Sequence, residues 1–211
     1  MKATSLIIQA LAAIGTVAVA ILAIWGDWFR AVLVPPKLTI QAHNGFRGTL
    51  TKFSSADPKM DGRRVIYYYL KVVNSRPWSP ARNCRVLLRG ILRRAPNQEF
   101  VPLPMVVPPQ FVWAPAQLTP PEITLSKEQM VDFGRLTDGF DYFEPTLYFY
   151  ANDFRGRVKS QEAIRYVLEI VADGFVASKY QVFEVAWDGK WSENLDEMGQ
   201  SLTIREIHED A

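Results

Sequence analysis

The chain has 211 residues, of which 48% are apolar and 22% are charged, with a formal net charge of +2. That apolar share is typical of a folded protein and excludes a wholly disordered chain. The single cysteine excludes an intramolecular disulfide framework and a cysteine-rich zinc site, and a net charge near zero does not favour nucleic acid as a partner.

The first predicted element is an apolar segment at residues 6–25, which contains one glutamine and no charged residue. A helix of that length spans roughly 30 Å, the thickness of the hydrocarbon core of a bilayer. The segment therefore predicts a single-pass transmembrane anchor. Aromatic residues and a charge at its end are typical of the membrane interface, where we expect Trp25, Trp28, Phe29 and Arg30.

A cleaved signal peptide is the competing interpretation, because Lys2 gives a basic start and residues 18–20 resemble a cleavage site. The apolar run continues beyond that site, however, and is longer than the ~7–15 residues of a signal sequence. The basic residues that follow the segment favour a cytoplasmic over a periplasmic or extracellular domain. Small residues every four positions would allow weak self-association of the anchor, and they are Ala12, Thr16 and Ala20.

We assign residues 1–26 to a short tail and the transmembrane helix, residues 27–36 to a membrane-exit linker, and residues 37–211 to one domain with a short acidic tail. Alternation of apolar and polar residues predicts strands in that domain, at residues 37–41, 64–74, 84–93, 146–151, 164–172, 180–187 and 201–207. Residues 192–198 show a helical pattern, with Ser192 as the expected N-cap. Many short strands and few helices favour a mainly β protein, an antiparallel β-sandwich of the immunoglobulin-like type.

One long stretch between predicted strands is rich in proline. Residues 96–121 hold eight of the 14 prolines, together with many large apolar residues. A disordered linker would not carry so much apolar surface, so we expect a packed crossover with one edge strand. Cys84 falls on an apolar strand face, which predicts a buried thiol without a redox role.

We find no catalytic motif and no metal-ligand spacing in the sequence. His43 and His208 lie at opposite ends of the domain, and neither has a partner at the spacing of a zinc site. We therefore expect no metal and no cofactor. Several acids follow one another in predicted loops, and we interpret them as solvated side chains: Asp132, Asp138, Asp141, Glu144 and Asp153. A calcium site and a carboxylate-based hydrolase are the alternatives that these acids leave open.

The distribution of charge is uneven. Residues 59–94 contain ten Lys or Arg residues and one acid, whereas residues 184–211 contain eight acids and two bases. In a strand over residues 84–93, Val86 and Leu88 would face the core and the alternate side chains would face outward. Arginine among aliphatic residues is typical of protein interfaces, so the predicted partner-binding face consists of Arg85, Leu87, Arg89, Ile91 and Arg93. Contact with anionic lipid headgroups, or a solvated face balanced by acids across the sheet, would explain the same pattern.

One predicted hairpin resembles a known family. A strand ends at Asn74, a turn follows, and residues 81–83 (Ala-Arg-Asn) lead into the next strand. This arrangement is similar to a hairpin of CARDB-type bacterial immunoglobulin-like domains, although Ser75 stands where those domains have glycine. The layout also resembles uncharacterised bacterial single-pass membrane proteins, with Pro-Lys-Leu at residues 36–38 and Trp-Asp-Gly-Lys-Trp at residues 187–191. The resemblance implies an immunoglobulin-like fold and no catalytic activity.

The sequence thus predicts a membrane-anchored, non-enzymatic β-sandwich module that binds a protein partner or organises a membrane complex. Its expected contacts are the lipid bilayer, an unknown protein and, through the anchor, a second copy of the chain. We expect no contact with nucleic acid.

Overall fold

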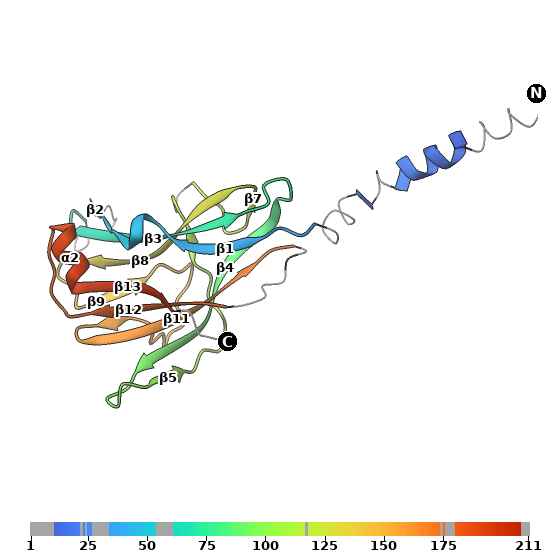
Figure 1. Cartoon of the computed structure of the whole chain (residues 1–211). Helices are drawn as coiled ribbons and strands as arrows, with labels where there is room; N and C mark the ends of the chain where they lie inside the picture. The colour runs from blue at the N-terminus through green and yellow to red at the C-terminus, as the bar shows by residue number, and fades with distance from the viewer. Residues whose placement is uncertain are drawn as a thin grey trace, which may run out of the picture.

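The computed structural model describes residues 11–21, 23, 25–26, 34–53, 61–116, 118–173, 175 and 180–207. Residues 11–21 form a helix with exposed side chains, drawn in blue in Figure 1. Among the described residues, no helix has both the length and the apolar character needed to cross a membrane. The predicted anchor also includes residues 6–10, 22 and 24, which lie outside the described residues.

The rest of the described chain is mainly β and forms two antiparallel sheets (Figure 1). In order across the first sheet lie β1 (Leu38–Ala42), β3 (Arg64–Asn74), β8 (Glu128–Thr137), β9 (Tyr142–Pro145) and β10 (Val158–Lys159), with β2 (Thr49–Lys52) beside β3 and β6 (Val112–Trp113) beside β8. In order across the second lie β13 (Leu202–Ile207), β12 (Gln181–Trp187), β11 (Glu162–Val171), β4 (Ala81–Arg94) and β5 (Phe100–Leu103), with β7 (Ile123–Leu125) beside β4. A 3-10 turn η1 (Asn44–Phe46) follows β1, and helix α2 (Leu195–Ser201) precedes β13. The arrangement is a β-sandwich.

A cluster of aromatic rings fills the space between the sheets. Phe133 on β8 lies 5.7 Å from Tyr166 and 5.9 Å from Phe183, ring centre to ring centre, and both of those residues belong to the second sheet. Phe133 also contacts Phe143 of β9, on its own sheet, at 6.0 Å and Phe111, which directly precedes β6, at 5.8 Å. Edge-on and tilted ring contacts at these distances are favourable beyond the burial of apolar area. The rings therefore hold the two sheets together.

The strand predictions are confirmed where the alternation is regular. The predicted strand at residues 64–74 is β3, and those at residues 164–172, 180–187 and 201–207 correspond to β11, β12 and β13. The prediction at residues 146–151 was wrong, because β9 ends at Pro145 and the following residues form loop. The sequence did not predict β8, in which Asp132 and Gly134 are both buried and interrupt the alternation.

The other local predictions are partly confirmed. The helix begins three residues later than expected, because Asn194 and not Ser192 caps it: the Asn194 Oδ1 accepts a hydrogen bond from the backbone N–H of Asp196 at 3.0 Å. Cys84 is buried as predicted. The proline-rich stretch is packed at Phe111–Ala114, whereas Val106 and Leu118 are exposed, and it contributes two strands, β5 and β6, instead of one.

The face assigned to β4 from the sequence is wrong beyond Leu88. Leu88 pairs with Leu168 and Gly90 pairs with Val167, so Arg89 is an extra residue in a β-bulge. Because each further residue then points to the opposite face, Ile91 enters the core at 3% exposure and Leu92 turns outward. Ile91 and Arg93 therefore do not share a face with Arg85, Leu87 and Arg89.

The faces assigned on either side of the bulge lead to a prediction about the stability of two variants. We expect Ile91→Ala to lower the free energy of unfolding by about 2–5 kcal/mol, because it opens a cavity in the core. Leu92→Ala, the matched control one residue away, is expected to cost less than about 1.5 kcal/mol, because Leu92 is only half-buried. Urea denaturation of both variants measures the difference, and equal losses would contradict the assigned faces.

Candidate functional site

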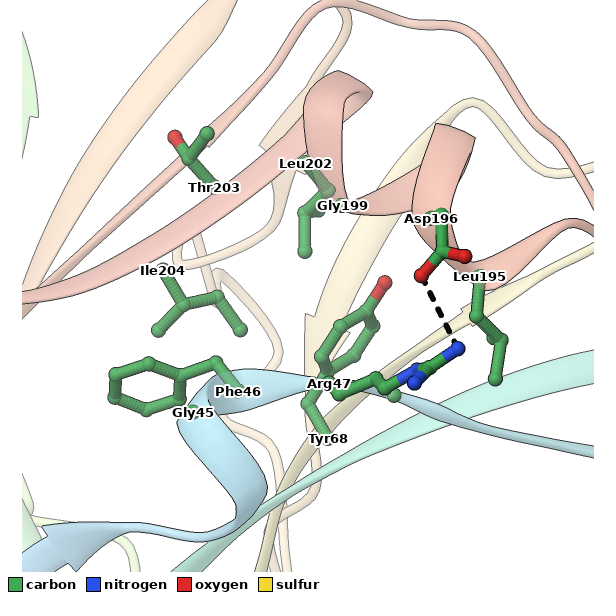
Figure 2. Close-up of a pocket in the computed structure, with 11 residues that line it drawn as sticks. Gly45, Phe46, Arg47, Tyr68, Leu195, Asp196, Gly199, Leu202, Thr203 and Ile204 are labelled. Carbon is green, nitrogen blue, oxygen red and sulfur yellow. Dashed lines mark ion pairs between the residues drawn. The ribbon is translucent and has the colours of Figure 1, made fainter.

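A pocket of about 380 Å³ opens at one end of the sandwich, between the η1 segment and the α2–β13 segment (Figure 2). Its volume is near the lower end of the range for ligand sites. The apolar part of its lining comes from Phe46, Tyr68, Leu195, Leu202 and Ile204, and the rest comes from Arg47, Asp196, Thr203 and three glycines. Phe46 and Tyr68 belong to the first part of the chain and Leu195, Leu202 and Ile204 to its last part, so the fold brings together segments that are far apart in the sequence.

The backbone of η1 is strained where it forms one wall of the pocket. Asn44, Gly45 and Phe46 have φ angles of 47°, 61° and 62°, which place three successive residues in the left-handed region. For residues other than glycine this conformation costs roughly 1–2 kcal/mol each. The strain directs the Phe46 ring to an edge-on contact with Phe183 at 6.0 Å. Strained backbone of this kind is concentrated at functional sites in proteins.

Two glycines keep the pocket open. A Cβ on Gly48 would lie 2.2 Å from Cγ2 of Ile66, so only glycine allows this segment to approach β3 so closely. A Cβ on Gly199 of α2 would have no atom within 4 Å, so the space in front of Gly199 is free. A larger side chain at Gly199 would enter the pocket without a clash in the fold.

Tyr68 supplies the polar group of the pocket. The residue is only 2% exposed, and its ring packs against Phe143 at 5.9 Å in the core. Figure 2 shows its hydroxyl directed into the pocket, where it makes no hydrogen bond with a described residue. Burial raises the pKa of this hydroxyl far above its ordinary value, so it stays protonated. Tyr68 therefore presents an O–H donor at the base of the pocket that no described residue uses.

An ion pair crosses the mouth of the pocket. Arg47 Nη2 lies 3.1 Å from Asp196 Oδ1, and both side chains are largely exposed (Figure 2). An exposed pair of this kind contributes about 0–1 kcal/mol to stability, so its groups are available to a ligand at little cost. With an apolar patch beside the Tyr68 hydroxyl and a charged pair at its mouth, the pocket suits an apolar group that carries a hydrogen-bond acceptor. Its lining residues contain no nucleophile paired with a base.

The arginines predicted to bind a partner are all engaged by acids of the chain itself. Arg85 Nη1 lies 3.1 Å from Glu122 Oε1, Arg89 pairs with Glu169, and Arg93 Nη1 lies 3.6 Å from Glu162 Oε1. Arg85, Leu87 and Arg89 do share the outer face of the second sheet. Arg93 follows the bulge along β4, so it does not share this face, and it donates a hydrogen bond to the carbonyl of Arg155 at 2.7 Å.

The same outer face carries an ionic cluster that the sequence did not predict. Glu184 is 2% exposed and accepts hydrogen bonds from Arg94 at 3.1 Å, Arg165 at 2.9 Å and Arg205 at 2.6 Å. Burial alone would raise the pKa of Glu184, but the bonds from Arg165 and Arg205 hold it below its ordinary value. The Arg165 guanidinium also lies 3.8 Å from the centre of the Phe100 ring. Strand alternation predicts that each of these side chains points outward. The residues are up to 111 positions apart, however, so the sequence does not indicate that they contact one another.

The predicted acidic loop residues do not form a common site. Glu144 lies 3.1 Å from Arg135 and 2.7 Å from Arg157, whereas Asp132 is buried within β8. Within the described part of the chain, no group of three or more acids, histidines or cysteines is arranged to hold a metal ion. His43 lies in the η1 loop with its ring edge-on to Tyr69 at 6.4 Å, and His208 lies outside the described residues.

The membrane-associated predictions fall at the start of the chain. Trp25 is described and exposed, whereas Trp28, Phe29 and Arg30 lie outside the described residues. Ala12, Thr16 and Ala20 lie on the helix of residues 11–21, where the Thr16 hydroxyl donates to the carbonyl of Ala12 at 2.9 Å.

No protein-family model and no curated protein sequence matches this chain. The function therefore has to be inferred from the geometry of the pocket and from the surfaces around it.

Asp132 generates a prediction about pH. Its carboxyl is 7% exposed, one of its oxygens has no hydrogen-bond partner among the described residues, and burial raises its pKa to about 7. Between about pH 4 and pH 7 the carboxyl is protonated only in the folded chain, so stability falls as the pH rises through this window. At roughly 1.4 kcal/mol per pKa unit, the loss amounts to about 4 kcal/mol above pH 7.

Asp132→Asn should remove this dependence, because the amide cannot ionise. We expect the variant to be more stable than the wild type at pH 8 and about equally stable at pH 4, as measured by urea denaturation at each pH. Two results would contradict the assignment: a stability of the wild type that rises steadily from pH 4 to pH 7, and a lower stability of the variant than of the wild type at pH 8.

Proposed function

We propose that this chain is a membrane-anchored, non-enzymatic module that binds a protein partner through the pocket at the end of its β-sandwich. The observation that carries the proposal is the hydroxyl of Tyr68, a donor that has no partner among the described residues and lies beside the apolar part of the pocket lining. A polar group at this depth favours a ligand that accepts its hydrogen bond. A ligand that covers the donor without accepting a hydrogen bond removes it from water, and this desolvation costs free energy.

The chemistry of the pocket favours a protein as the ligand. An apolar side chain of a partner would fill the space between Phe46, Leu202 and Ile204. The backbone carbonyl next to that side chain would accept the hydrogen bond of Tyr68. Charged residues of the partner would meet Arg47 and Asp196 at the mouth. An apolar centre with a polar rim is the usual composition of a protein interface.

The anchor belongs to the same proposal. The apolar residues 6–25, the aromatic residues that follow them and the resemblance to CARDB-type membrane proteins support a single-pass anchor that precedes an immunoglobulin-like domain on the cytoplasmic side.

Anionic lipid is the alternative ligand for the basic outer face, and Arg94, Arg165 and Arg205 around one glutamate leave a local excess of positive charge there.

Variants of the pocket test the proposed binding. A photo-crosslinking residue at Thr203, on the pocket wall, would be incorporated in the full chain in its native membranes. Gly199→Phe fills the pocket and is expected to abolish the crosslink to the partner. Tyr68→Phe removes one hydrogen bond of about 1 kcal/mol and should weaken the crosslink roughly fivefold at limiting concentrations.

Gly199→Ala is the matched control, since it adds a methyl group to the same position of α2 and favours the helix by about 0.5–1 kcal/mol. It should retain the crosslink. All three variants are expected to keep the wild-type melting temperature or exceed it, because none removes a contact of the core. A crosslink that persists in a folded Gly199→Phe variant would exclude the pocket as the binding site.

The anchor is tested by extraction of membranes with alkaline carbonate. We expect the full-length chain to stay in the membrane pellet, because an apolar helix has no favourable state in water. Replacing Ile14 and Val17 by lysine should release it to the supernatant, because a charge at the centre of a membrane helix costs about 2.5–3.5 kcal/mol or more. Release of the wild type, or a mature N-terminus near Ile21, would exclude the anchor.

A further inference from the structure

An exposed tryptophan stands at the end of the sandwich that receives the N-terminal segment. Trp78 lies in the turn between β3 and β4 and is 65% exposed. The turn is closed by a hydrogen bond from the N–H of Ser79 to the carbonyl of Arg76 at 2.9 Å, with Pro77 at its second position. Proline at that position fixes the turn, so the indole is held outward by a rigid backbone.

A buried side chain anchors this turn from below. Asn74 is 2% exposed, and its Oδ1 accepts hydrogen bonds from the N–H of Arg76 at 3.0 Å and of Lys37 at 3.3 Å. Its Nδ2 donates to the carbonyl of Ser79 at 2.8 Å. The amide of one residue thus joins both ends of the turn to the segment that enters the domain.

Further bonds tie the turn to residues that come directly from the apolar segment. The Ser79 hydroxyl donates to the carbonyl of Val34 at 2.7 Å, and Arg76 Nη1 donates to the carbonyl of Pro35 at 3.0 Å. Only eight residue steps separate Val34 from Gly26, so the turn lies within about 28 Å of that residue. Figure 1 shows α2, which contributes Leu195, Asp196 and Gly199 to the pocket lining, at the opposite end of the sandwich.

Basic residues surround the tryptophan. Lys37, Arg76 and Lys127 lie on three segments that are bonded to one another, because the N–H of Asn74 donates to the carbonyl of Lys127 at 2.7 Å. Lys37 and Lys127 are exposed and form no ion pair with the described residues. Tryptophan with lysine and arginine is the composition that the headgroup layer of an anionic membrane favours.

We infer that this end of the sandwich rests on the membrane surface, with Trp78 in the headgroup layer and Lys37, Arg76 and Lys127 facing anionic lipid. The inference depends on the proposed anchor, which brings the turn to the membrane. It adds a second point of contact, so the domain has a fixed orientation: the β3–β4 turn faces the bilayer and the Tyr68 pocket faces away from it.

Spin labels on the full chain in vesicles of zwitterionic and anionic lipid test this orientation. Single cysteines would be introduced as Val17→Cys on the N-terminal helix, Ser75→Cys in the turn beside Trp78, and Gln200→Cys at an exposed position of α2 outside the pocket lining. The native Cys84 does not interfere, because burial raises the pKa of its thiol to about 12 and hides it from reagents. Accessibility to oxygen relative to a water-soluble nickel complex reports the depth of each label.

We expect the label at Val17 in the hydrocarbon core, the label at Ser75 at the interface and the label at Gln200 in water. Trp78→Gln in the Ser75→Cys chain should shift that label towards the value measured at Gln200, while the melting temperature is unchanged. A label at Ser75 that is as accessible to nickel as the label at Gln200, with Val17 in lipid, would overturn the inference and leave the anchor intact. A label at Val17 in water would overturn both.

Discussion

The contacts of the Phe133 ring are the interaction on which the rest of the structure depends. This ring touches Phe143 on its own sheet, Phe111 just before β6, and Tyr166 and Phe183 on the other sheet, so it joins the two layers. The same chain of rings continues to the candidate site, because Tyr68 packs on Phe143 and Phe46 packs on Phe183. The pocket is thus the place where the aromatic core reaches the surface and leaves one hydroxyl without a partner among the described residues.

Charge on this protein is mostly compensated within the chain. The basic stretch that stands out in the sequence pairs with glutamates of β11, β12 and the loop before β7, and Glu184 alone accepts bonds from three arginines. These pairs explain why a chain with a local excess of arginine can expose an outer sheet face without a bound partner. The lysines at the β3–β4 end differ, since Lys37 and Lys127 form no ion pair with the described residues.

The sequence predicted the mainly β architecture because β3 and β11 alternate without interruption. It missed β8, where Asp132 and Gly134 occupy buried positions and a register shift opposite Tyr68 and Tyr69 disturbs the period. It assigned β4 correctly only to Leu88, because a β-bulge has no signature in a single sequence. The pocket could not be predicted, since its walls are more than a hundred residues apart and Tyr68 has the pattern of an ordinary core residue.

The attachment of the N-terminal segment to the sandwich has a mechanical consequence. Residues 34–36, which the sequence placed in a linker, are bonded to the β3–β4 turn, and β1 continues directly from them along β3 with paired residues from Leu38 to Ala42. Tension on the N-terminus would pull β1 along its own axis and load all of these backbone hydrogen bonds in shear at once, not one after another. The first part of the domain to receive a force applied through the N-terminal segment is therefore one in which several backbone hydrogen bonds resist it together.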